Sequence, residues 1–96
     1  MTFCTYILYS PSLDKYYIGE TENLEERIEL HNVHFFEGSF TSQANDWQIY
    51  FSIKCETRSI ARLIEGHIKK MKSRKYIENL KKYPDISKSL LLKYKS

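Results

Sequence analysis

The stretch FCTYILYSPSLDKYYIG, residues 3–19, decides the fold. It opens with a run of apolar, aromatic and β-branched residues from Phe3 to Tyr9, a composition that favours strands. The turn-forming segment Ser10-Pro11-Ser12-Leu13-Asp14 follows, and a second strand-like run leads from Lys15 to Gly19. Two such runs joined by a short turn predict a β-hairpin.

A helix is predicted directly after the hairpin, over residues 23–32. Asn23 is a suitable N-cap, and Glu26 completes a capping-box pattern three residues later. Leu24, Ile28 and His31 fall on one stripe at helical spacing. From residue 33 to 46 the periodicity fails, which indicates a loop. We expect this loop to fold against the sheet through three aromatic residues, Phe35, Phe36 and Phe40.

The second half of the chain predicts one more strand and further helices. Trp47 to Cys55 has the β-branched and aromatic density of a strand. Thr57 is a good N-cap for a second helix, and Ser73 for a third that stops before Pro84. A last short helix is expected from Ile86 to Tyr94. The core-facing stripe of the second helix is Ile60, Leu63, Ile64, His67, Ile68 and Met71, and that of the third is Ile77 and Leu80.

These elements predict an α+β fold, with a three-stranded antiparallel sheet flanked by helices in the order β-β-α-β-α-α. The chain of 96 residues is long enough for one hydrophobic core and too short for two. We therefore expect a single domain over residues 1–96, with a core at about 3–80 and a basic helical C-terminal extension at 81–96.

Composition narrows the class of protein. With 42% hydrophobic and 28% charged residues and only three Gly, the chain is of a globular kind, which argues against disorder and low-complexity repeats. Its apolar runs are shorter than the roughly 18 residues that a membrane span needs, and its N-terminus lacks a signal-peptide pattern. We expect a soluble, cytoplasmic protein.

The two cysteines, Cys4 and Cys55, are expected to be reduced core thiols. Neither belongs to a Cys-x-x-Cys pair, so the sequence offers no thiolate zinc site and no dithiol redox motif. Both stand in apolar, strand-like surroundings, where free cysteine is commonly buried.

Charge is divided unevenly along the chain. Residues 1–65 hold 5 Lys/Arg against 10 Asp/Glu, and residues 66–96 hold 10 against 2, so the net charge changes from −5 to +8. A basic C-terminal third can follow a phosphate backbone, because each neutralised phosphate releases counterions. A solvated lysine-rich helix face would show the same pattern.

Four features stand at informative spacing. Cys4-Thr5-Tyr6 lies in the first strand, and Tyr17-Ile18-Gly19 in the second. Arg27 and His31 lie one turn apart in the first helix, and Glu65 lies in the second helix. Together they resemble the GIY-YIG nuclease superfamily, with the second triplet intact and the first reduced to its tyrosine. The resemblance extends from about Phe3 to Leu80 and is closest to small stand-alone members similar to the N-terminal domain of an excinuclease.

The resemblance implies hydrolysis of phosphodiester bonds in nucleic acid, expected to be DNA, by an endonuclease-type domain acting in repair or recombination. Glu65 would hold one Mg²⁺ or Mn²⁺ ion, which prefers oxygen ligands and keeps several waters. Arg27 would stabilise charge on the phosphate. Tyr6 or Tyr17 would activate water, with a phenol pKa lowered by Arg27 and the metal. His31 would relay the proton or position the phenol.

Two residues are assigned supporting roles by the same resemblance, Gly19 and Asn79. The side chains expected to contact the nucleic-acid backbone are Lys69, Lys70, Lys72, Arg74 and Lys75. They carry charge without an identifiable base-reading element, which favours recognition of shape over sequence. We expect the hydroxyls of Tyr6 and Tyr17, the Arg27 guanidinium and the Glu65 carboxylate to open onto a single cleft.

Plainer interpretations of the same residues stay open. Strand tyrosines are most often packing residues, and Arg27 can be an ordinary charge on a helix surface. Glu65 can pair with Lys69 one turn later, an arrangement worth only about 0.3–0.5 kcal/mol. At the level of function, the alternatives are a catalytically inactive nucleic-acid-binding module on the same fold and a purely structural or protein-interaction role.

Overall fold

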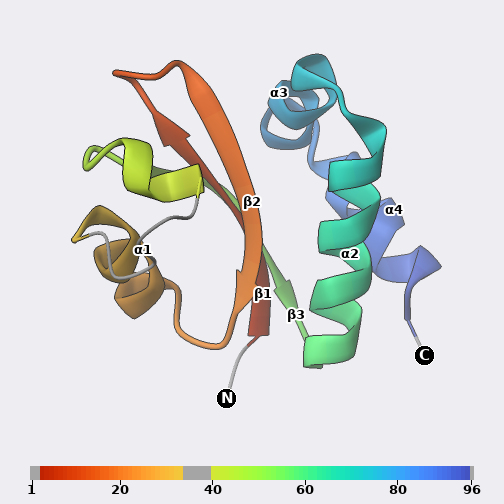
Figure 1. Ribbon diagram of the computed structural model, residues 1–96. Helices are drawn as coiled ribbons and strands as arrows, with labels where there is room; N and C mark the ends of the chain where they lie inside the picture. The colour runs from red at the N-terminus through yellow and green to blue at the C-terminus, as the bar shows by residue number, and fades with distance from the viewer. Residues whose placement is uncertain (1–2, 34–39, 96) are drawn as a thin grey trace.

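The computed structural model describes residues 3–33 and 40–95 (Figure 1). Its elements, in chain order, are β1 (Phe3–Ser10), β2 (Lys15–Thr21), α1 (Leu24–Asn32), the 3₁₀ helix η1 (Phe40–Gln43), β3 (Gln48–Cys55), α2 (Arg58–Met71), α3 (Arg74–Lys82) and α4 (Pro84–Lys93). The strands form one antiparallel sheet in the order β2-β1-β3. The predicted α+β fold is confirmed, and the expected last short helix follows α3 as α4.

The hairpin places β1 in the centre of the sheet and β2 at one edge. Tyr6 of β1 lies opposite Gly19 of β2, and Leu8 lies opposite Tyr17. On its other side β1 pairs with β3, with an irregularity in register between Ile7 and Leu8. Because β1 is covered on both edges and both faces, its side chains at residues 4–8 are all buried.

The two faces of the sheet carry separate clusters of apolar side chains, because successive side chains of a strand point to opposite faces. Figure 1 shows the sheet between α1 on one side and α2 with α3 and α4 on the other. The helical layer packs on the face that carries Ile7 and Ile53, and the Thr5 hydroxyl donates to the Ala61 carbonyl of α2 at 2.7 Å. On the opposite face Cys4, Tyr6 and Leu8 of β1 pack with Ala44 and Trp47 from the segment between η1 and β3.

Three helices begin at the residues that the sequence predicts. The side chains of Asn23, Thr57 and Ser73 each accept a hydrogen bond from the backbone N–H three residues later, at 3.1 Å. Such caps satisfy N–H groups that have no partner inside the helix. The first helix, the third strand and the second and third helices therefore lie where expected, to within one or two residues at their ends.

The predicted stripe of α2 is too wide. Ile60, Ile64 and Ile68 are buried as expected, but Leu63 and Met71 are 49% and 45% exposed. A helix resting on a single sheet face buries a narrow stripe, and here Ala61 completes it. His67, expected to be a satisfied core histidine, is half-buried and shares a hydrogen bond of 2.9 Å with the Tyr94 hydroxyl.

The predicted last helix is present as α4. It begins at Pro84, two residues before the expected start, because proline at the first helical position already has a helical φ. Its Leu90 is buried in the same cluster as Ile77 and Leu80 of α3. The segment assigned to a C-terminal extension thus packs on the core.

The loop predicted for residues 33–46 contains η1. Phe40 opens this short helix and lies with its ring against Tyr17, as a loop folding on the sheet requires. The expected contacts of Phe35 and Phe36 lie outside the described residues. Cys4 and Cys55 are both buried and free, as predicted. Within residues 3–33 and 40–95, no helix has the length and apolar character to cross a membrane.

Gly66 lies in the middle of α2, where a glycine costs about 1 kcal/mol relative to alanine. A Cβ built on Gly66 meets no atom within 4 Å. Packing therefore does not explain this glycine.

Replacing Leu90 tests the packing of α4 on the core. Leu90→Ala removes a side chain that is 4% exposed and should lower the free energy of unfolding by about 2–5 kcal/mol. Leu92→Ala, at a position 73% exposed two residues later, is the matched control and should change it by less than about 0.5 kcal/mol. Urea denaturation measures both. Equal effects of the two substitutions would contradict the packing of α4.

Candidate active site

Two tyrosines and a histidine meet on the α1 face of the sheet, near the β2 edge. The ring centroids of Tyr6 and Tyr17 are 6.4 Å apart, and those of Tyr17 and His31 are 5.0 Å apart with an edge-on arrangement. β1, β2 and α1 supply one ring each, so the cluster exists only once the hairpin and α1 have packed together.

Gly19 makes room for Tyr6. A Cβ built on Gly19 would lie 2.5 Å from the Tyr6 hydroxyl oxygen and 2.6 Å from the ring carbon that bears it. These distances are far inside van der Waals contact. The glycine of the Tyr17-Ile18-Gly19 triplet is therefore required by the phenol across the ladder, and its supporting role here is steric.

His31 is held at both ring nitrogens. Its Nε2 shares a hydrogen bond of 3.0 Å with the Tyr6 hydroxyl, and its Nδ1 shares one of 2.7 Å with the Thr41 hydroxyl. The Thr41 carbonyl accepts a hydrogen bond from the indole of Trp47 at 2.8 Å, which fixes η1 beside the cluster. Tyr6, His31 and Thr41 are all buried, so this hydrogen-bonded chain has a fixed geometry.

Thr41 is not among the residues that the sequence singles out. It stands in the segment where periodicity fails, and a single threonine in a polar loop carries no signal of burial. A buried His31 does imply a partner for its second nitrogen. The sequence therefore indicates that His31 has a second polar partner, but it does not indicate that this partner is Thr41.

Burial sets the protonation states of the chain. It lowers the pKa of His31 to about 4, helped by the positive charge of Arg27, so the imidazole is neutral at pH 7. Burial also raises the pKa of Tyr6 well above its ordinary value of 10, and neighbouring Tyr17 adds to that rise. The expected lowering of the pKa by Arg27 is present at Tyr6, but desolvation outweighs it.

Tyr17 is the more accessible of the two phenols. It is half-buried, whereas Tyr6 is 2% exposed. Its ring is stacked against Phe40 at a centroid distance of 6.4 Å and lies edge-on to Trp47. Since Tyr6 is closed off from solvent, the prediction that both phenols open onto one cleft is wrong for Tyr6.

Two charged side chains on different helices, Arg27 on α1 and Glu65 on α2, act on the cluster through their charges. The Arg27 guanidinium lowers the pKa of Tyr6 and the Glu65 carboxylate raises it, so both charges act at the Tyr6 hydroxyl. Arg27 is half-buried on α1 and lines a hollow of about 90 Å³ together with Asn23 and Glu26. Of the predicted site residues, Arg27 and Glu65 thus influence Tyr6 through their charges.

Glu65 also forms the predicted ion pair with Lys69. Glu65 Oε2 lies 2.6 Å from Lys69 Nζ, and the two side chains are 20% and 52% exposed. An ion pair this exposed contributes little to stability. It does mean that one carboxylate oxygen is engaged by an ammonium group.

The donor set at Glu65 fits a hard divalent ion. A carboxylate oxygen is the ligand that Mg²⁺ and Mn²⁺ prefer, and such ions are commonly held by one or two carboxylates plus water and substrate oxygens. Among the described residues no group of three or more His, Cys, Asp or Glu side chains can hold a metal. A metal here would rest on Glu65 and on oxygens from outside the protein.

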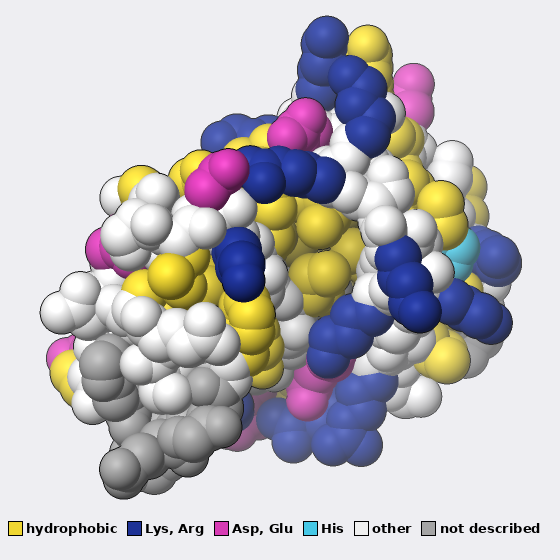
Figure 2. All heavy atoms as spheres, turned by 45° about the horizontal axis from the view of Figure 1, so that its top comes forward, with side chains coloured by type: hydrophobic (Ala, Val, Ile, Leu, Met, Phe, Trp, Pro, Cys, Tyr) yellow, Lys and Arg dark blue, Asp and Glu magenta, His cyan; other side chains and the backbone are white. Residues whose placement is uncertain are grey.

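A hollow of about 290 Å³ runs beside β2; we name it the edge groove. Its lining side chains come from the hairpin, η1, the end of α2 and the start of α3: Asp14, Lys15, Tyr16, Ile18, Phe40, Ile68, Lys69, Lys72, Ser73, Arg74 and Ile77. Figure 2 shows an apolar floor flanked by Lys and Arg side chains. Phe40 links it to the cluster, since its ring stacks on Tyr17, and Lys69 pairs with Glu65.

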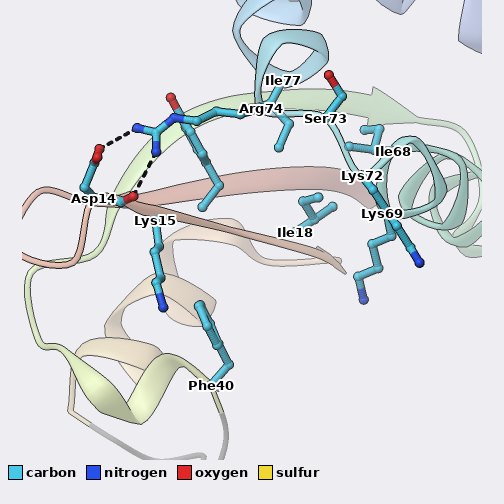
Figure 3. A pocket seen from close by; sticks show the side chains of 11 residues that line it. Asp14, Lys15, Ile18, Phe40, Ile68, Lys69, Lys72, Ser73, Arg74 and Ile77 are labelled. Carbon is cyan, nitrogen blue, oxygen red and sulfur yellow. Dashed lines mark hydrogen bonds and ion pairs between the residues drawn. The ribbon is translucent and has the colours of Figure 1, made fainter.

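The predicted backbone-contacting residues do not form one surface. Lys69, Lys72 and Arg74 line the edge groove, and Figure 3 shows Arg74 held by Asp14 across it. Lys70 lines a different hollow, on the other side of α2. Lys75 is exposed on α3.

Asn79 stays outside the cluster. It is half-buried on α3, and its backbone carbonyl accepts a hydrogen bond from Tyr83 N–H at 2.8 Å. In the described part of the chain, its side chain makes no hydrogen bond to the tyrosines or to His31.

Comparison with known proteins identifies a family. Residues 2–79 match the family model of the GIY-YIG catalytic domain. Neither the curated proteins nor the solved structures gave a significant match. Domains of this family are typically endonucleases that act on nucleic acid and generally depend on a divalent metal ion.

Adding a methyl group at Gly19 tests the close approach of Tyr6. Gly19→Ala should lower the free energy of unfolding by about 1–3 kcal/mol, because the Tyr6 ring must move. Gly66→Ala, which adds the same methyl group in open space, should raise it by up to about 1 kcal/mol. Urea denaturation of both variants checks this, and a Gly19→Ala protein as stable as the wild type would contradict the contact.

The neutral His31 predicts a pH dependence of stability. Its folded pKa of about 4 lies below the ordinary value of 6.5, so the unfolded chain binds the proton more tightly. The free energy of unfolding is therefore highest above pH 6.5. It falls as the pH drops toward and below 4, by as much as about 3 kcal/mol in all. Denaturation curves between pH 7.5 and 4 measure it.

The matched control for this pH dependence is His67. Burial also lowers the pKa of His67. His67→Gln should therefore remove part of the dependence of the unfolding free energy on pH, and His31→Gln should remove the larger part. Asp14 and Asp46 have lowered pKa values too, but their effect falls below pH 3.8, outside this window. A slope unchanged in His31→Gln would refute the neutral, buried imidazole.

Proposed function

The chain belongs to the GIY-YIG family, and on that premise we propose that it is a metal-dependent endonuclease that hydrolyses phosphodiester bonds in DNA. The observation that supports this best is the buried Tyr6–His31 pair over Gly19, with the charges of Arg27 and Glu65 acting at the same hydroxyl. The resemblance to an excinuclease domain favours DNA met in repair or recombination as the substrate.

Tyr17 is the proposed proton acceptor. Of the two phenols it is the one that solvent reaches, and a general base must reach the water that it deprotonates. In the proposed reaction the water oxygen bonds to phosphorus and its proton passes to the deprotonated oxygen of Tyr17. The leaving oxygen departs with the electron pair of its bond to phosphorus and takes up a proton from solvent water.

Tyr6 and His31 act as positioning residues. Tyr6 stays protonated, because burial raises its pKa, and its hydroxyl is fixed by His31 Nε2 at 3.0 Å. The two rings then form a rigid wall against which Tyr17 is packed. Rigid packing of the base limits the geometries that it can adopt relative to a bound phosphate.

Arg27 is the proposed phosphate ligand. A guanidinium keeps its charge at all working pH values and can donate two parallel hydrogen bonds to phosphate oxygens. Its charge already acts at the Tyr6 hydroxyl and at His31. The same charge would stabilise the additional negative charge that develops on the phosphate in the transition state.

Glu65 is the proposed metal ligand. A divalent ion bound there would supply Lewis-acid stabilisation of the phosphate. Lys69 holds Oε2 of this carboxylate at 2.6 Å, and its exposed stem lets the ammonium move to a substrate phosphate along the edge groove.

A binding module without turnover is the second candidate. The engaged Glu65 carboxylate favours it, because one of its two oxygens is already paired with the Lys69 ammonium group. The replacement of Gly and Ile by Cys4 and Thr5 in the first triplet points the same way. Under this alternative the protein binds nucleic acid in a salt-sensitive manner and releases no product.

Cleavage assays separate the two candidates. Labelled duplex, flap, branched and single-stranded DNA are incubated with Mg²⁺ or Mn²⁺, and the wild type should yield metal-dependent products. Tyr17→Phe and Glu65→Gln should each lower the cleavage rate by about 100-fold or more. Circular dichroism confirms that the variants are folded.

Glu78→Gln is the matched control for Glu65→Gln. Glu78 likewise forms an ion pair with a basic residue one turn away, Arg74, and both lie on the neighbouring helix α3. Its substitution should leave the cleavage rate within about twofold of the wild type. Full activity in Glu65→Gln would refute the metal role, and salt-sensitive binding with no product from the wild type would favour the binding module.

A further inference from the structure

A second hollow lies on the far side of α2, between α2 and the end of α4. Its volume is about 500 Å³, and it is lined by Arg62, Leu63, Gly66, His67, Lys70, Lys93 and Tyr94. It shares no lining residue with the edge groove. We name it the α2–α4 groove.

The lining of the α2–α4 groove is cationic. Arg62, Lys70 and Lys93 contribute three positive charges, and none of the seven lining residues is acidic. Arg62 is within 3.6 Å of Glu20. Within residues 3–33 and 40–95, Lys70 and Lys93 form no ion pair, in contrast to Arg58, Lys69 and Arg74.

The positive potential acts on His67 as well. Burial lowers the pKa of His67, and the charges of Lys93 and Lys70 lower it further. Two ammonium groups from different helices therefore converge on one imidazole. The ring is held in place by the 2.9 Å hydrogen bond between its Nδ1 and the Tyr94 hydroxyl.

Gly66 keeps the floor of the groove open. It weakens α2, and its Cβ position is free of contacts, so neither helix formation nor packing accounts for it. Because Gly66 lines the groove, any side chain at this position would occupy space above the helix backbone. A glycine at such a point allows a ligand to approach the backbone closely.

We propose that the α2–α4 groove binds the phosphate backbone of the nucleic-acid substrate, away from the scissile phosphate. The inference rests on the proposed function for the identity of the substrate. A polyanion fits a groove in which two lysine ammonium groups converge beside Arg62. Such ammonium groups suit phosphates without selecting a sequence. With the edge groove on its other side, α2 then lies between two segments of bound nucleic acid.

The test measures binding of a fluorescein-labelled branched DNA and a duplex of about 30 base pairs by anisotropy, in EDTA so that nothing is cleaved. The double variant K70E/K93E reverses two charges of the groove. K88E/K95E makes the same change of charge at two exposed positions that line neither groove. Gly66→Gln fills the groove without adding charge.

We expect K70E/K93E to raise Kd at least tenfold and to lower the slope of log K against log salt by about 2. K88E/K95E should raise Kd less than threefold. Gly66→Gln should raise Kd several-fold while its melting temperature stays at or above that of the wild type. Equal effects of K70E/K93E and K88E/K95E would overturn the inference, as would binding unchanged by Gly66→Gln.

The outcomes keep this inference apart from the proposed function. If the wild type shows metal-dependent cleavage and K70E/K93E changes neither the cleavage rate nor Kd, the role of the groove is refuted and the proposed nuclease activity is supported. Groove-dependent binding without any product supports the groove and refutes turnover. If the wild-type protein binds no nucleic acid, both proposals are overturned. Binding of an acidic protein to the α2–α4 groove would overturn the assignment of the groove to nucleic acid.

Discussion

The hydrogen bond between the Tyr6 hydroxyl and His31 Nε2 is the interaction on which the candidate site depends. It joins the central strand to α1 across 25 residues of sequence and lies in the interior. A buried phenol and a buried imidazole each cost free energy unless they have partners. Here each is the other's partner, and Thr41 satisfies the second nitrogen. Burial of the pair keeps His31 neutral and Tyr6 protonated, and the two rings hold Tyr17 in place.

Two features of the chain make that bond possible. The hairpin register sets Gly19 opposite Tyr6, and only a residue without Cβ leaves space for the phenol there. The Asn23 cap fixes where α1 begins, so the side chain two turns later faces the sheet. A shift of one residue in either element would separate the two rings, because strand side chains alternate between faces and helix side chains rotate by about 100° per residue.

Helix α2 connects the cluster with the basic surface. One side of it carries Glu65, whose charge acts on Tyr6, and Lys69, which lines the edge groove. Another side carries Gly66 and Lys70 in the α2–α4 groove. The positive charge of the C-terminal third is therefore divided between two faces of the molecule. A single Lys-rich helix surface, the plainer interpretation of the charge pattern, does not describe this division.

The fold was predictable from the sequence because its signals are local. Caps at Asn23, Thr57 and Ser73 and the hairpin runs depend on residues that are neighbours in the chain. The exposure of Leu63 and Met71 was not predictable, because it depends on how far the sheet extends under α2.

The candidate site was predictable only through the spacing of its motifs. Thr41 and the raised pKa of Tyr6 needed the structure, because both arise from burial by segments distant in sequence. The ion pair between Glu65 and Lys69, in contrast, was predictable from their spacing of four residues.

Direct observation of the His31 imidazole tests the account most sharply. Nitrogen NMR of ¹⁵N-histidine-labelled protein, with His31→Gln to assign the signals, reports the protonation of each ring nitrogen between pH 4 and 8. We expect His31 to stay neutral from pH 8 down to about 5 and to be half protonated near pH 4, and we expect Tyr6→Phe to change the Nε2 signal. An imidazole that titrates near 6.5, with an Nε2 signal insensitive to Tyr6→Phe, would contradict it.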